Sequence, residues 1–175
     1  MDESSWLDEA RKLTEYRKEA VSFLLRASSR FDASPEHAKA VSHLWLEADK
    51  LDSLIYGLLE EINRGLLSGK GEIDVTRGAS VKPHHGSDTL FYDCTWSILW
   101  KPNHGIAVNL AVEPASASFE MKVASLKAGE EEIVPFPPES SALKNTLKNA
   151  YAAEASIPTP DIPKKHRKAV NNKRQ

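Results

Sequence analysis

Residues 82–100, KPHHGSDTLFYDCTWSILW, bring together side chains that could do chemistry. The stretch contains His84, His85, Asp93 and Cys94, which is the only cysteine of the chain. A thiolate can act as a nucleophile, and histidine, cysteine and aspartate can all bind metal ions. The alternative is that these residues only form a turn followed by a strand. Which interpretation holds depends on the secondary structure that positions the side chains.

Apolar and polar residues alternate in four stretches after the first 72 residues, which is the pattern of half-buried β-strands. The connections between the stretches are short and rich in proline, glycine, asparagine and serine. We therefore predict an antiparallel meander over residues 72–136, with one face covered by helices. Its strands are residues 73–81, 90–100, 106–112 and 119–123, with residues 133–136 as a candidate fifth strand.

The second and third of these stretches can be aligned across their short connection. This alignment pairs Trp100 with Ile106 and Cys94 with Val112. Cys94 then points into the core, where apolar surroundings raise the pKa of a thiol and remove its nucleophilic character. We predict that Cys94 is a packing residue.

The histidines near this strand lie at its two ends. His104 is in the connection to the next strand, whereas His84 and His85 precede the strand. At roughly 3.3 Å per residue, they are about 40 Å apart or more. We predict that they do not share a metal ion and that His84 and His85 form a turn.

The same alignment places Asp93 opposite Glu113 on the polar face, with Glu120 diagonally adjacent and His85 near the same end. Cross-strand Cβ atoms are about 4.5–5.5 Å apart, so two carboxylates there would share a proton or a hard cation. This predicts a small acid–base or metal-dependent enzyme. If both groups are exposed, water screens them and no site forms; we favour this interpretation, and predict no catalytic residue, metal or cofactor.

Before residue 72 the apolar residues recur every three or four positions, which is typical of amphipathic helices. One such run covers residues 6–31, and a second covers residues 41–62 after the turn and helix-start signal DASPE at 32–36. We predict an antiparallel helical hairpin over residues 3–67, about 40 Å long at 1.5 Å per residue. A short amphipathic helix over residues 140–155 completes an α+β fold in a single domain, residues 1–157.

The charge of −2 is unevenly distributed along the chain. Residues 158–175 carry six basic side chains against one acidic, while the first 157 residues carry 17 basic against 24 acidic. We predict a disordered basic tail after an acidic domain, which repels nucleic acid and favours a basic partner. The basic residues of the tail are Lys164, Lys165, Arg167, Lys168, Lys173 and Arg174.

The chain contains no apolar run of membrane-spanning length, and its first residues are acidic, unlike those of a signal peptide. A single cysteine also fits a reducing compartment. We therefore expect a cytoplasmic protein that does not bind membranes. Nuclear import is an alternative in a eukaryote, because the tail contains a basic cluster.

The function predicted from these patterns is that of a non-catalytic protein-binding accessory protein, of the inhibitor, immunity or anti-defence, chaperone or adaptor type. Trp6, Phe31, Trp45 and Leu59 are predicted to bind the partner. Trp6 and Phe31 lie in the seam of the first helix, Trp45 and Leu59 lie beside that of the second, and apolar residues near the Phe31–Trp45 tip or the Trp6 end should project from the hairpin. A coiled-coil homodimer is one form of this association. The alternatives are a nucleic-acid accessory factor that uses the tail and the acid–base enzyme. If Trp45 is buried, the outer sheet face around Thr95, Asn109 and Lys122 becomes the better candidate.

Overall fold

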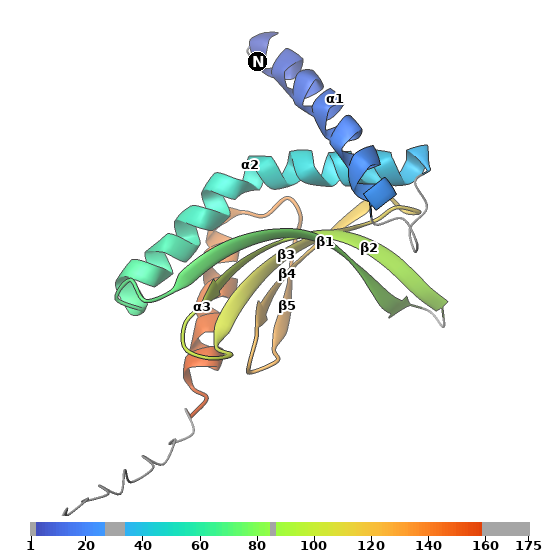
Figure 1. Ribbon diagram of the computed structural model, residues 1–175. Helices are drawn as coiled ribbons and strands as arrows, with labels where there is room; N and C mark the ends of the chain where they lie inside the picture. The colour runs from blue at the N-terminus through green and yellow to red at the C-terminus, as the bar shows by residue number, and fades with distance from the viewer. Residues whose placement is uncertain (1–2, 27–33, 85–86, 159–175) are drawn as a thin grey trace, which may run out of the picture.

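The computed structural model describes residues 3–26, 34–84 and 87–158 (Figure 1). The predicted α+β fold is confirmed, with two N-terminal helices, an antiparallel sheet and a C-terminal helix, and the candidate fifth strand is present. Phe31, His85 and the basic tail from residue 159 lie outside the described residues. The elements are α1 (Glu3–Arg26), α2 (Pro35–Leu66), β1 (Glu72–His84), β2 (Ser87–Leu99), β3 (Gly105–Glu113), β4 (Ser118–Ser125), β5 (Glu131–Val134) and α3 (Ser140–Ala155).

The sheet is a meander in the order β1-β2-β3-β4-β5, and every neighbouring pair is antiparallel. Along β2, Tyr92, Cys94, Trp96 and Ile98 are buried, while the residues between them are more exposed. The alternation predicted from the sequence is therefore correct, and it points Cys94 into the core.

The predicted register of β2 and β3 is wrong by two residues. Ile106 pairs with Ile98 instead of Trp100, and Cys94 pairs with Leu110. The reason is a wider turn, in which Lys101 and Asn103 have positive φ and the Trp100 N–H donates to the His104 carbonyl at 3.0 Å. A shift of two residues keeps every side chain on its face, so the buried face is unchanged.

The helices α2 and α3 share one core with the buried face of the sheet. Leu44, Ile55 and Leu59 of α2 and Leu143 and Leu147 of α3 are all fully or almost fully buried in it. At about 1.5–3 kcal/mol for each large apolar side chain, this burial is the main source of stability.

Local signals fix where α2 begins and ends. The Ser34 hydroxyl accepts from the His37 N–H, and Pro35 follows at the first helical position, as the sequence predicts. After the helix, the Asn63 side chain bonds both to the carbonyl and to the N–H of Gly71, at 3.0 and 2.8 Å. A Cβ at Gly71 would lie 2.7 Å from Ile98, so this close approach of chain and sheet requires glycine.

The hairpin of α1 and α2 differs from the one predicted. α1 crosses α2 near its own C-terminal end, and its N-terminal half projects from the body (Figure 1). Only Ala20 and Leu24 of α1 are fully buried, whereas Trp6 and Ala10 of its predicted seam are exposed. The physical reason is that apolar residues along the whole of α2, from Ala38 to Leu59, are buried in the core that it shares with the sheet and α3, so little apolar surface is left for the first turns of α1.

The prediction that Trp45 and Leu59 project from the hairpin is also wrong. Leu59 is completely buried in the core that α2 shares with the sheet. Trp45 is only 5% exposed and meets the rings of Tyr16 and Phe23 edge-on, with centroids 5.9 and 5.8 Å apart. The guanidinium carbon of Arg77, from β1, lies 4.9 Å from the Trp45 ring centroid.

We call Tyr16, Trp45, Asp49 and Arg77 the α1 clasp, because they join α1 to α2 and β1. The Tyr16 hydroxyl donates a hydrogen bond to the Asp49 carboxylate, and Arg77 lies 3.8 Å from the other carboxylate oxygen. Burial, followed by the hydrogen bond to Asp49, raises the pKa of Tyr16 to about 12. The clasp is therefore the part of the structure that positions α1.

Replacing Trp45 by alanine tests the clasp. The change removes a buried ring, so we expect the free energy of unfolding to fall by about 3–5 kcal/mol in urea titrations. Trp6→Ala is the matched control: Trp6 is 63% exposed, and its loss should change stability by about 0.5 kcal/mol or less. Equal effects of the two substitutions would contradict the clasp.

Candidate functional site

The two carboxylates predicted to face each other do not do so. Asp93 pairs across the sheet with Ala111, and Ala111 with Glu120, while Glu113 pairs with Ser118. Asp93 accepts a hydrogen bond from the Ser80 hydroxyl at 3.4 Å. The like-charge pair on which the acid–base hypothesis depended was a product of the register error described above.

Metal ligands do not converge in the described part of the chain either. Within residues 3–26, 34–84 and 87–158, no group of three or more His, Cys, Asp or Glu side chains could hold a metal ion. His85, the third candidate, lies outside the described residues. The residues chosen for their chemistry are thus not brought together by the described structure.

Cys94 is 1% exposed, and burial raises the pKa of its thiol to about 12, an effect that nearby Arg77 partly offsets. The thiolate is the reactive form of cysteine, so this side chain is almost entirely unreactive near neutral pH. The interpretation of Cys94 as a packing residue is confirmed by its position.

A buried carboxylate that the sequence analysis missed lies at the end of α3. Glu154 is fully buried and accepts hydrogen bonds from the backbone N–H groups of Gly105, Lys127 and Ala128, at 2.9 to 3.1 Å. It ties α3 to the start of β3 and to the connection between β4 and β5. The available signal was its position in the apolar series Leu143, Leu147, Ala150, Glu154.

His104 completes this buried cluster. The Lys127 Nζ lies 3.2 Å from the His104 Nε2. A lysine ammonium can only donate, so Nε2 accepts and the ring proton is on Nδ1, 3.5 Å from the Glu154 Oε1. Because the carboxylate is already held by three backbone donors, we interpret the cluster as a structural latch, although a cavity of about 490 Å³ opens beside it.

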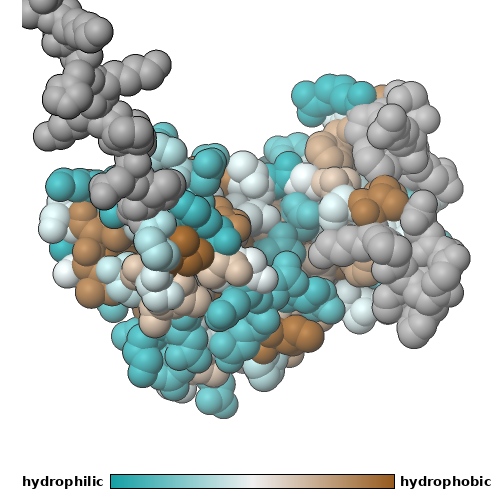
Figure 2. All heavy atoms as spheres, turned by 90° about the horizontal axis from the view of Figure 1, so that it is seen from below, coloured by the Kyte–Doolittle hydropathy of each residue, from teal (hydrophilic) through white to brown (hydrophobic). Residues whose placement is uncertain are grey.

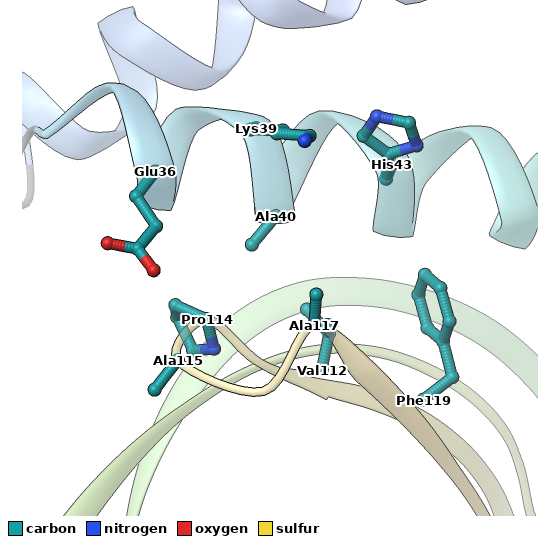
Figure 3. Close-up of a pocket in the computed structure, with 9 residues that line it drawn as sticks. All are labelled: Glu36, Lys39, Ala40, His43, Val112, Pro114, Ala115, Ala117 and Phe119. Atoms are coloured by element: carbon teal, nitrogen blue, oxygen red, sulfur yellow. The ribbon is translucent and has the colours of Figure 1, made fainter.

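A second hollow, of about 300 Å³, lies between the first turns of α2 and the β3–β4 connection (Figure 3). Its sheet side is apolar, and Ala40 faces it from the helix. Burial lowers the pKa of His43 on its rim, so that imidazole is uncharged at neutral pH. The groove suits a small apolar group. It is lined by Glu36, Lys39, Ala40, His43, Val112, Pro114, Ala115, Ala117 and Phe119.

The outer face of the sheet offers mainly polar groups. Asn109 donates to the Thr95 hydroxyl at 2.8 Å, and Lys122 forms an ion pair with Glu120 at 2.9 Å. Seen from below, the molecule is largely hydrophilic, with separate apolar patches (Figure 2). Ile133, which pairs with Lys122 and is 66% exposed, is the large apolar side chain beside this polar group of Thr95, Asn109 and Lys122.

Large apolar side chains remain exposed along α1. Trp6 is 63% exposed and Leu25 57%, with Leu7 and Val21 above 40%. Of the four predicted partner-binding residues, only Trp6 is thus described and exposed. Leu25 was missed, although it lies four positions after Val21 on the same side of the helix. We call Trp6, Leu7, Ala10, Val21 and Leu25 the open face of α1.

Comparison with known proteins gives no further guide to the function. No family model, curated protein or solved structure matches this chain. Within the described residues, none of the helices has both the length and the apolar character needed to span a membrane.

The buried thiol predicts a simple chemical behaviour. We expect that Cys94 in the folded protein at pH 8 does not react with a disulfide reagent, because its pKa of about 12 leaves almost no thiolate. After unfolding in guanidinium chloride, one thiol per chain should react within minutes. Rapid reaction of the folded protein would show that β2 is not packed as described.

The latch predicts a large effect of Glu154→Ala. This substitution leaves the N–H groups of Gly105, Lys127 and Ala128 without their acceptor, so we expect the free energy of unfolding to fall by about 3–5 kcal/mol. Glu154→Gln keeps one acceptor oxygen and should cost less, about 1–3 kcal/mol. Glu61→Ala on the surface of α2 is the control. If denaturant titrations show that Glu61→Ala and Glu154→Ala lower the free energy of unfolding equally, the latch is contradicted.

Proposed function

We propose that this protein is a non-catalytic protein-binding protein that recognises its partner through the open face of α1. The observation that carries the proposal is the exposure of Trp6, Leu7, Val21 and Leu25 on one helix. Single exposed apolar residues are common on soluble proteins, but several along one ordered helix are typical of an interaction surface.

The way α1 is held supports this role. Its C-terminal half is fixed by the α1 clasp and by the burial of Ala20 and Leu24. Toward its N-terminus, Lys12 lies 3.8 Å from Asp49 and Glu9 lies 3.7 Å from Lys50, and such exposed ion pairs contribute about 0–1 kcal/mol each. The first turns of α1 thus gain little from their own chain, and a partner would supply the missing contacts.

The chemistry of the surface defines the partner. Trp6 and Leu25 are anchors that would each contribute about 1–3 kcal/mol when buried. They lie on a preformed helix, so little conformational entropy is lost on binding. A second amphipathic helix, or a groove lined by apolar side chains, is the complementary surface.

The double variant Leu7→Glu/Leu25→Glu tests the proposal. Full-length protein is immobilised, retained proteins are identified, and each is purified and titrated by calorimetry. We expect the double variant to weaken binding by about 100-fold, since charges replace two apolar anchors. The control is Ile133→Glu, because Ile133 is 66% exposed on β5, away from α1, and should bind like the wild type. Loss of binding in the control but not in the α1 variant would place recognition on the sheet and refute the proposal.

A further inference from the structure

The exposed residues of α1 form a row with a regular spacing. Leu7, Ala10, Thr14, Val21 and Leu25 are separated by three, four, seven and four positions. At 3.6 residues per turn they fall within about 60° of the helix circumference. All five are exposed, and the residues that contact α2, such as Tyr16 and Ala20, lie on a different side of the helix.

The row is complementary to the same row of a second α1 that runs in the opposite direction. With Leu7 of one copy opposite Leu25 of the other, Ala10 lies beside Val21, and the small residue faces the larger one. Two-fold symmetry repeats both contacts at the other end. We infer that the open face of α1 pairs with the same face of a second copy, giving an antiparallel homodimer. The inference rests on the proposed function and names the partner at that surface.

The charges beside the row support this alignment. Glu15 and Lys18 lie on the same flank of the row, and antiparallel pairing brings Glu15 of each copy next to Lys18 of the other. This pair occurs twice in the dimer, so the alignment gains two attractive contacts. In a parallel arrangement this flank of one copy would face the opposite flank of the other, so the contacts between Glu15 and Lys18 would be lost.

One residue opposes the pairing. Arg17 lies at the edge of the row near the two-fold axis, where it approaches Arg17 of the other copy. It is exposed, and its long side chain can reach solvent at modest cost. α2 crosses α1 near the C-terminal end of α1, and the N-terminal half of α1 projects beyond it, so that half is open to a second helix (Figure 1).

The test is the dissociation constant of the dimer, measured by analytical ultracentrifugation of the full chain. The wild type should sediment at about twice the chain mass of 19.4 kDa at high concentration. Glu15→Lys and Lys18→Glu should each weaken the dimer about tenfold, because each turns two attractions into repulsions. The double variant Glu15→Lys/Lys18→Glu should restore the wild-type constant within about threefold. Arg17→Leu should tighten the dimer about tenfold.

Controls separate this inference from the proposed function. Circular dichroism must show that each variant keeps its helix content, and Ile133→Glu should dimerise like the wild type. A chain that remains monomeric at every concentration overturns the dimer, while loss of another partner in Leu7→Glu/Leu25→Glu would still support the proposed function. A dimer that is insensitive to all the α1 variants overturns the inference, because it must use another surface.

Discussion

The apolar face of the sheet has to be covered, and α2 is the element that covers most of it. Leu44, Ile55 and Leu59 insert into this face together with Leu143 and Leu147 of α3. A helix has a limited apolar circumference, and apolar residues along all of α2 are buried in this core, so little of that circumference is left for α1. The projection of α1, the burial of Leu59 and the dependence of α1 on a small clasp all follow from this single requirement.

The sequence predicted the secondary structure well, because its periodicities are clear. The two-residue alternation from Tyr92 to Ile98 placed the buried face of β2 correctly, and Ser34-Pro35 marked the start of α2. The pairing register of β2 and β3 was harder to predict from the sequence. It depended on Lys101 and Asn103 adopting positive φ, a conformation that these residue types do not require. The register error placed Asp93 opposite Glu113; in the observed register Asp93 pairs with Ala111, so there is no candidate catalytic pair.

Site prediction failed where it needed to know which neighbour a surface would meet. Trp45 and Leu59 were correctly recognised as apolar residues beside a helical seam, but their burial depends on Arg77 of β1 and on the sheet. Periodicity describes the faces of a helix and not the elements that cover them. Glu154 differs from these two residues. The sequence shows a charged residue in an apolar series, but its role became clear only from the loops whose N–H groups it binds.

The α1 clasp also has a mechanical consequence. From Tyr16, where the clasp holds α1, to Trp6 there are 10 residues of helix, or about 15 Å at 1.5 Å per residue. A force applied to Trp6 therefore acts through a long lever on the contacts of Tyr16 and Trp45 with Arg77. Arg77 belongs to β1, an edge strand with a neighbour on only one side. A load on the tip of α1 is thus transmitted to the sheet through one of its two outermost strands.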